Sequence, residues 1–262
     1  MSIFELPLKT IIMNIINKDI ELYDSYNKNH PNKKYSLGLI IDEIIYVLKT
    51  GLAWRNIRSP IKWQTLYGHF RKLASHNVFN KLFHHLRQQY VKRVPIDTLV
   101  VDSTFVMNKY GHNKKSRNKF YKNKHGNKVS LVTDINGVPL SVIVNKGSVH
   151  DLSFMDRHIT DIKPMIRRKK PHTMLADKGY ESKQLRGNLI DYGIQLMIPK
   201  KKGSVSNYVY DKNVYKQRII IENTFQRLKA FRRSAIRYDK IFSSFVAFTL
   251  LVMSILIYNC CV

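Results

Sequence analysis

Three acidic residues, far apart in the chain, stand where carboxylates could hold divalent cations. Asp102 and Asp177 each end a short aliphatic and β-branched segment, residues 98–102 and 173–177, and this composition predicts two buried strands. Strand ends lie at the rim of an open α/β sheet, where ligands bind. A carboxylate among apolar neighbours is unfavourable unless it is paired or binds a metal. We therefore predict a cation site at this rim, with two aspartates that simply start turns as the alternative.

The third candidate, Glu222, lies on a helix that the pattern predicts from about Val214 to beyond Lys229. Four side chains spaced three, four and seven residues apart project along one stripe of this helix: Tyr215, Arg218, Glu222 and Lys229. An apolar stripe runs beside them, so Glu222 is predicted at the edge of the buried face. The alternative is a plain helix on which Arg218 and Glu222 form an ion pair four residues apart.

Three such carboxylates suit the cutting and joining of a phosphodiester. That reaction needs an activated oxygen nucleophile, neutral charge around the phosphoryl group and a stabilised leaving group, and two Mg²⁺ ions about 4 Å apart supply all three. Mg²⁺ takes oxygen ligands and keeps several waters, so a few carboxylates suffice. Asp102, Asp177 and Glu222 are therefore candidates for catalytic residues that hold two Mg²⁺ ions, with Mn²⁺ as the alternative metal, although three acids far apart in the chain do not by themselves establish a site.

The charge balance points to a polyanionic partner. The chain of 262 residues has 45 basic and 18 acidic side chains, hence a net charge of +27. Such a field attracts nucleic acid above all, while a membrane surface or an anionic polysaccharide is the alternative partner. An acidic cluster inside so basic a chain is reasonable if cations bridge the acids to phosphate.

The N-terminal region predicts a small helical domain. Ser36 is placed to cap a helix that Gly51 ends, and two further helices are expected near residues 62–73 and 78–90. Three short helices with a tight break are typical of a helix-turn-helix module. We predict a helical DNA-binding domain at residues 1–95, with a plain helical bundle as the alternative. Its candidate DNA-binding residues, on the second helix, are Lys62, Gln64, Arg71 and Lys72.

Residues 96–262 predict a mixed-sheet α/β domain. Two strands flank the turn dipeptide Asn136-Gly137, and helices then alternate with strands. Residues 109–128 are predicted as a basic loop with interleaved aromatic side chains, which suits contact with a nucleic-acid backbone. A solvated flexible loop is the alternative. The DNA-binding candidates in this loop are Lys114, Lys115 and Arg117.

The uncharged C-terminal segment, residues 241–262, is long enough to cross a bilayer. Polar residues such as Ser243 and Thr249 dilute it, and a helix apolar on all sides can equally fill a protein core. We favour the buried helix and no membrane partner, with a tail-anchored membrane protein as the alternative.

Several motifs together resemble the DDE transposases of the insertion-sequence-four and insertion-sequence-five group of bacterial elements. The spacing Tyr215-x2-Arg218-x3-Glu222-x6-Lys229 matches that group's tyrosine–arginine–glutamate–lysine signature. Residues 101–104 and 176–180 resemble its two aspartate motifs, residues 133–140 its hairpin, and residues 147–151 the turn that follows. Residues 46–55 and 63–67 resemble its helical DNA-binding region. The resemblance runs from about residue 36 to the end of the chain.

The resemblance implies an RNase-H-like catalytic domain and a transposase that cleaves DNA and transfers strands at the ends of an insertion sequence. It implies Asp102, Asp177 and Glu222 as metal ligands, and contacts of Tyr215, Arg218 and Lys229 with DNA near the cut end. The expected partners are double-stranded DNA, as terminal inverted repeats and target, and a second copy in a homodimer. The expected location is the cytoplasm, at the nucleoid.

Two points remain beside this resemblance. A catalytically inactive or repurposed sequence-specific DNA-binding protein is the alternative function. His150 and Asp151 recur in the group's pattern, and we interpret them as caps of the following helix.

Overall fold

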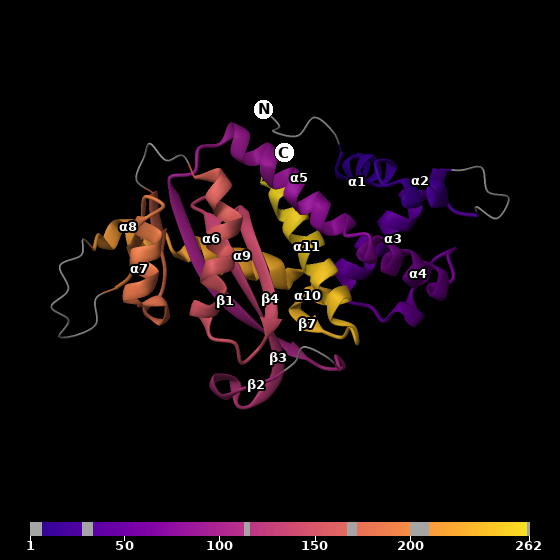
Figure 1. Cartoon of the computed structure of the whole chain (residues 1–262). Helices are drawn as coiled ribbons and strands as arrows, with labels where there is room; N and C mark the ends of the chain where they lie inside the picture. The colour runs from indigo at the N-terminus through magenta and orange to yellow at the C-terminus, as the bar shows by residue number, and fades with distance from the viewer. Residues whose placement is uncertain (1–6, 28–33, 113–115, 167–171, 200–209, 261–262) are drawn as a thin grey trace. The chain divides into compact units, whose positions relative to one another are not determined.

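The computed structural model describes residues 7–27, 34–112, 116–166, 172–199 and 210–260 (Figure 1). Contacts divide the chain into two compact units. The helical unit contains residues 1–90, 108–113 and 228–262, and the sheet unit contains residues 91–107 and 114–227. Residues 228–262 thus group with the N-terminal helices, whereas the sequence analysis places them in the catalytic domain. Each unit is described by itself.

A mixed sheet forms the sheet unit. Its strands are β1 (Thr98–Asn108), β2 (Ser116–Asn118), β3 (Lys124–Asp134), β4 (Pro139–Lys146), β5 (His172–Leu175) and β6 (Ile194–Met197). They lie in the order β4-β3-β1-β5-β6, and β2 pairs with the start of β3. Strand β3 is antiparallel to β1 and β4, while β5 is parallel to β1 and β6 to β5. This is the strand order of an RNase-H-like domain, as the resemblance implied.

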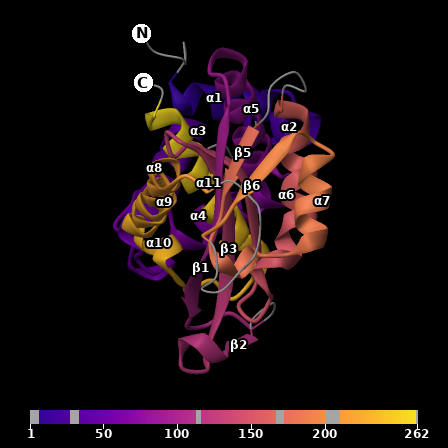
Figure 2. The same cartoon turned by 90° about the vertical axis from the view of Figure 1, so that its left-hand side faces the viewer.

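Helices cover both faces of this sheet. Figure 2 shows α6 and α7 on one face and α8 and α9 on the other. The helices of this region are η2 (Lys119–Tyr121), η3 (Asp151–Phe154), α6 (Met155–Ile162), η4 (Lys163–Met165), η5 (Lys178–Tyr180), α7 (Lys183–Ile190), α8 (Lys212–Lys216) and α9 (Ile219–Ala230). The strands between these layers are buried on both faces, which explains their aliphatic runs.

The hairpin between β3 and β4 is confirmed at its predicted turn. Gly137 has a φ of +73°, which a glycine adopts without strain. The Asp134 carboxylate accepts the N–H groups of Asn136 and Val138, each at 2.9 Å. The turn dipeptide and an aspartate three residues before Gly137 therefore fix this hairpin locally.

One predicted strand and one predicted loop were wrong in extent. Strand β1 continues to Asn108, so Asp102 lies inside the strand rather than at its end. Residues 109–128, predicted as a loop, include β2, η2 and the start of β3. The cause is pairing between distant segments: β1 and β3 remain in register as far as Met107 opposite Gly126. The end of β1 and the start of β3 form backbone hydrogen bonds with each other. A local sequence pattern does not predict such pairing between distant segments.

The helix predicted from Val214 past Lys229 is broken. The N–H groups of Gln217 and Arg218 bond to the carbonyls of Val214 and Tyr215, three residues back, so a tight turn separates α8 from α9. The turn places Arg218 at the start of α9.

The helical unit contains α1 (Leu8–Asn17), α2 (Ile20–Asn27), α3 (Leu37–Thr50), η1 (Trp54–Asn56), α4 (Trp63–Ser75), α5 (Val78–Arg93), α10 (Arg232–Ala235), β7 (Ile236–Arg237) and α11 (Phe242–Asn259). The last three residues of α5 fall in the sheet unit. Helices α3, α4 and α5 were predicted, whereas α1 and α2 were not. The caps of α3 are confirmed: the Ser36 hydroxyl accepts the Leu39 N–H at 3.2 Å, and Gly51 is left-handed with φ +69°.

Helix α11 packs into the core of this unit. Phe248 stacks on Phe70 of α4, with ring centres 4.3 Å apart, and Trp54 lies against both rings. The Arg233 guanidinium lies over Trp54 and Phe248 and pairs with the buried Asp239 at 2.8 Å. By length and composition α11 could cross a membrane, yet 67% of it is buried inside the protein. The burial agrees with the predicted core helix.

We expect Gly51→Ala to destabilise the protein by about 1–3 kcal/mol, because a side chain in the left-handed region is strained. An added Cβ would also meet the Arg232 Cβ at 2.8 Å. Urea unfolding measures the change. Gly68→Ala is the control, because Gly68 lies within α4 with nothing within 4 Å of the new Cβ, and helix propensity predicts a gain of up to about 1 kcal/mol. Equal stability of Gly51→Ala and the natural protein would contradict the strain argument.

Candidate active site

The sheet brings Asp102 and Asp177 to the same level. Strands β1 and β5 pair in parallel, with Val100 opposite Leu175, and each aspartate lies two residues beyond that pair. Asp177 follows β5 and caps η5, where its carboxylate accepts the Gly179 N–H at 2.8 Å. Asp102 therefore reaches the rim at which β5 ends, although β1 itself continues.

Arg218 connects Glu222 to this pair. Its guanidinium forms an ion pair with the Asp102 carboxylate through Nη2 and another with Glu222 Oε1 through Nη1, the latter at 3.1 Å. The side chains of Asp102 and Arg218 are 18% exposed, and that of Glu222 is 50% exposed. The Arg218 guanidinium thus bridges Glu222 and Asp102, and Glu222 is on the solvent side. We call Asp102, Asp177, Glu222 and the neighbouring Asp151 the acidic cluster.

Burial dominates the electrostatics of Asp102. It raises the pKa of this carboxyl from 3.8 to about 6, against the lowering effects of Arg218 and of the Ser103 N–H. The charges of Asp177 and Asp151 raise the pKa further. Arg218 therefore offsets only part of the cost of burying the Asp102 charge.

The carboxylates fit divalent cations by their chemistry. Within the described residues, no three His, Cys, Asp or Glu side chains are close enough together to hold one ion. Arg218 instead bridges Asp102 and Glu222, so a positive group already stands between two of the three predicted ligands. Carboxylate oxygens are the ligands that Mg²⁺ takes, so the three predicted residues fit this metal by the chemistry of their donor atoms.

The sequence analysis missed the part that Asp151 takes in this region. His150 does cap η3, since its Nδ1 accepts the Leu152 N–H at 3.3 Å. Asp151 does not cap: its carboxylate accepts the Ser103 hydroxyl at 2.5 Å and pairs with Lys128 Nζ at 3.0 Å. The sequence feature that could have indicated this role is that Asp151 belongs to the motif at residues 147–151 shared with the transposase group. The segment after β4 is thereby tied to β1 and β3 beside Asp102.

The other two residues of the four-residue signature, Tyr215 and Lys229, have no ion pair or hydrogen bond to the acidic residues among the contacts described above. Tyr215 is half-buried in α8, with its ring 5.5 Å from that of Tyr210, and burial raises its pKa. Lys229 is exposed, seven residues after Glu222 on α9, and groups with the helical unit. The sheet unit therefore unites Tyr215, Arg218 and Glu222.

The candidate DNA-binding residues of α4 differ in whether their side chains form hydrogen bonds within the protein. Gln64 and the helix-capping Lys62 are exposed at the start of α4. Arg71 donates to the Ser244 hydroxyl at 3.2 Å, and Lys72 donates to the Ser25 hydroxyl. Contact of Arg71 or Lys72 with DNA would exchange these hydrogen bonds.

The predicted basic loop is only partly described. Arg117 is exposed in β2, where its Nε donates to His125 Nε2 at 3.4 Å. Lys114 and Lys115 lie outside the described residues. An exposed arginine on a short paired strand suits contact with a phosphate.

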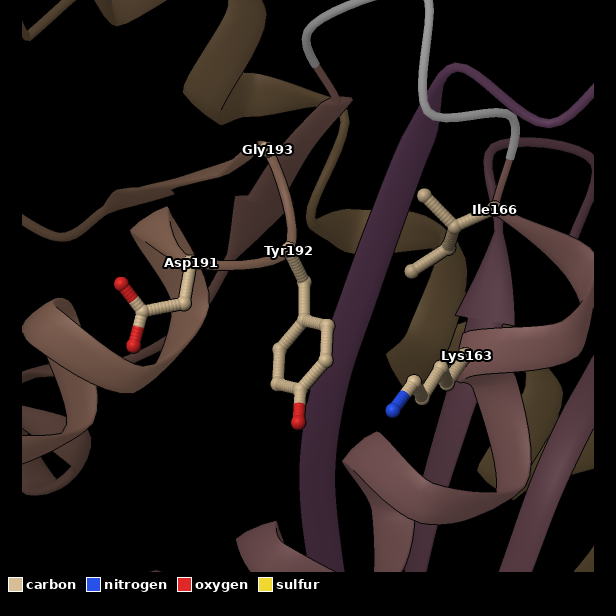
Figure 3. Close-up of a pocket in the computed structure, with 5 residues that line it drawn as sticks. All are labelled: Lys163, Ile166, Asp191, Tyr192 and Gly193. Carbon is tan, nitrogen blue, oxygen red and sulfur yellow. The ribbon is translucent and has the colours of Figure 1, made fainter.

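A separate cavity of about 370 Å³ lies between η4 and the end of α7 (Figure 3). The described residues that line it are Lys163, Ile166, Asp191, Tyr192 and Gly193. The Lys163 ammonium lies 5.0 Å from the centre of the Tyr192 ring. None of these residues belongs to the carboxylate cluster, so the cavity is distinct from the candidate active site.

The RNase-H-like sheet thus has acids on its central strand, after the neighbouring parallel strand and on a following helix. The family model of the transposase DDE domain matches residues 94–259. The chain belongs to this DDE transposase family.

The chain is also similar to individual proteins. The chain is 27% identical over 177 residues to a Burkholderia cepacia protein assigned as the transposase of insertion sequence element IS402, covering 64% of this chain and 81% of that protein. Among solved structures, the piggyBac transposase synaptic complex with hairpin DNA has a TM-score of 0.47 at 10% identity, covering 96% of this chain and 64% of that chain. The Mos1 mariner catalytic domain has a TM-score of 0.31 at 10% identity, covering 69% and 90%. Both structural likenesses are distant, and this chain spans less than two thirds of the piggyBac chain.

The raised pKa of Asp102 predicts a pH-dependent stability. The unfolded pKa is near 3.9, and the folded value is about 6. Stability from this group is therefore fully present below about pH 4 and is lost as pH rises through about 6, by at most about 3 kcal/mol. Asp102→Asn removes this dependence, so in chelator-treated buffer the variant should gain stability relative to the natural protein between about pH 4 and pH 8. Urea unfolding across this range measures the difference.

The control is Asp156→Asn, because Asp156 is exposed on α6. A stability difference between Asp102→Asn and the natural protein that stays constant with pH would contradict the raised pKa.

Proposed function

We propose that this protein is the transposase of an insertion sequence and catalyses metal-dependent DNA cleavage and strand transfer at the element's ends. Asp102, Asp177 and Glu222 are the proposed ligands of two Mg²⁺ ions, with Mn²⁺ as a substitute. The observation that carries the proposal is the bridge from Asp102 through Arg218 to Glu222, with Asp177 level with Asp102 just after the neighbouring strand β5.

In the proposed mechanism the chain's own side chains position the DNA and the cations. When bound, the two cations supply activation of the attacking oxygen and stabilisation of the leaving oxygen. Arg218 moves out of its bridge between Asp102 and Glu222 and contacts a phosphate of the transposon end, where its planar fork suits two phosphate oxygens. Tyr215 and Lys229 contact the same DNA segment from α8 and α9.

The proposed partners follow from charge and position. The net charge of +27 suits double-stranded DNA, both as terminal inverted repeats and as target. Lys62 and Gln64 at the start of α4 contact the repeats, joined by Arg71 and Lys72 from the same helix. Lys114, Lys115 and Arg117 follow the backbone.

The remaining proposals concern assembly and subgroup. Two DNA ends are held by a homodimer, at the nucleoid in the cytoplasm. Residues 1–95 act as the DNA-binding domain and residues 96–262 as the catalytic domain, of the insertion-sequence-four and insertion-sequence-five group. All three acids are present and the family is one of transposases, so a catalytically inactive DNA-binding protein is not favoured.

Removal of each carboxylate tests the mechanism. We expect Asp102→Asn, Asp177→Asn and Glu222→Gln each to lower Mg²⁺-dependent strand transfer by about three orders of magnitude or more, because the three act as one unit. The assay uses the full chain and duplexes that carry the element's own ends. DNA affinity, measured in parallel, should be kept.

Two matched controls are Asp156→Asn and Asp191→Asn, which remove exposed acids of the sheet unit. Wild-type strand transfer by any of the three carboxylate variants would remove that residue from the mechanism.

Replacement of Arg218 separates cation binding from catalysis. Arg218→Gln removes the positive charge between Asp102 and Glu222, so the DNA-free protein should bind Mn²⁺ roughly tenfold more tightly. Strand transfer should nevertheless fall about 100-fold, because the proposed phosphate contact is lost. Titration calorimetry and the strand-transfer assay measure the two effects, with Arg157→Gln on the exposed face of α6 as control. Unchanged or weaker Mn²⁺ binding would show that Arg218 does not compete with the cation.

A further inference from the structure

A buried hydroxyl without a partner lies beside the acidic cluster. Tyr180 ends η5, three residues after Asp177, and is 1% exposed. Its phenol oxygen has no hydrogen-bond partner within the described residues. Buried polar groups in folded proteins are almost always paired, so an unpaired one calls for a specific explanation.

Burial and nearby negative charge both raise the pKa of this hydroxyl. Burial raises the pKa of Tyr180 above its ordinary value, and the charges of Asp151, Asp102 and Asp177 raise it further. The phenol therefore keeps its proton at neutral pH and can donate a hydrogen bond. Helix η5, which carries it, packs against η3, which begins with Asp151.

Its polar neighbour on β3 is already engaged. Ser130 lowers the pKa of Tyr180 as a hydrogen-bonding neighbour, although the phenol oxygen has no partner that meets both the distance and the angle of a hydrogen bond. Ser130 instead bonds to His158 Nε2 at 2.9 Å, and His158 Nδ1 bonds to the Ser141 hydroxyl at 2.8 Å. Ser130 also donates to the Asp102 backbone carbonyl at 3.5 Å. A serine oxygen can accept a further hydrogen bond, so a structural bond from Tyr180 to Ser130 is the alternative that the Ser130→Ala variant tests.

We propose that Tyr180 is a positioning residue of the active site, whose hydroxyl donates to the carboxylate of Asp102 or Asp177 when these residues hold divalent cations. The inference rests on the proposed function. Asp151 is the fourth acid of the cluster, held by Ser103 and Lys128. In the cation-free protein the donor stays unpaired, and in the loaded protein it fixes one carboxylate in its binding orientation.

Tyr180→Phe removes only the hydroxyl, and Mn²⁺ titration of the full chain without DNA measures its effect. We expect Mn²⁺ affinity to fall about 10- to 100-fold, as is typical when a group that orients a metal ligand is lost. The melting temperature in chelator-treated buffer should stay unchanged or rise, because no hydrogen bond is lost in the cation-free state.

Two variants distinguish this role from plain structure. Tyr26→Phe removes a buried hydroxyl that does have a partner, His69 Nδ1 at 3.0 Å, and should lower the melting temperature without changing Mn²⁺ affinity. Ser130→Ala should likewise lower the melting temperature and leave Mn²⁺ affinity within about twofold, since its hydroxyl bonds to His158 and to the Asp102 backbone carbonyl and not to a carboxylate.

The outcomes are separable from failure of the proposed function. Unchanged Mn²⁺ affinity of Tyr180→Phe, or a lowered melting temperature with Mn²⁺ affinity changed equally by Ser130→Ala, overturns the role of Tyr180. Mn²⁺ binding by the natural protein that is no tighter than by Asp102→Asn instead overturns the proposed cation site itself.

Discussion

Asp102 carries its carboxylate inside a buried strand, and this placement requires positive charge from elsewhere in the sheet unit. The strands on both sides of β1 supply none at that position, since Leu131 of β3 stands opposite Asp102 and β5 has already ended. Arg218, more than a hundred residues later in the chain, supplies it. The break between α8 and α9 matters for this reason, because it sets Arg218 at the start of the helix that also carries Glu222.

The register of the sheet brings residues that are distant in the sequence close together in space. Parallel pairing of β1 with β5 fixes Asp177 level with Asp102, and antiparallel pairing of β1 with β3 places Lys128 where it meets Asp151. The two pairings use opposite edges of one central strand. A shift of one residue in either register would turn the side chains to the other face of the sheet and dissolve the cluster.

The sequence predicted those features whose causes are local. The β3–β4 turn follows from Asn136-Gly137, and the ends of α3 follow from Ser36 and Gly51. The length of β1, the turn at Gln217 and the environment of Tyr180 depend on contacts between distant segments, which no local pattern contains. The resemblance selected the three acids as a group, whereas Asp151 was interpreted as a cap because its partners, Ser103 and Lys128, are remote in sequence.

An acidic cluster in a chain of net charge +27 couples cation binding to DNA binding. The basic side chains attract the DNA backbone at every position, but a phosphate that approaches Asp102, Asp177 and Glu222 meets like charge unless cations neutralise it. In the cation-free protein Arg218 neutralises part of that charge, and it is then not available for a phosphate. Bound cations in the proposed mechanism therefore remove the repulsion and release Arg218 together. Because coupling between two bound species is reciprocal, DNA at the cluster must strengthen cation binding by the same factor.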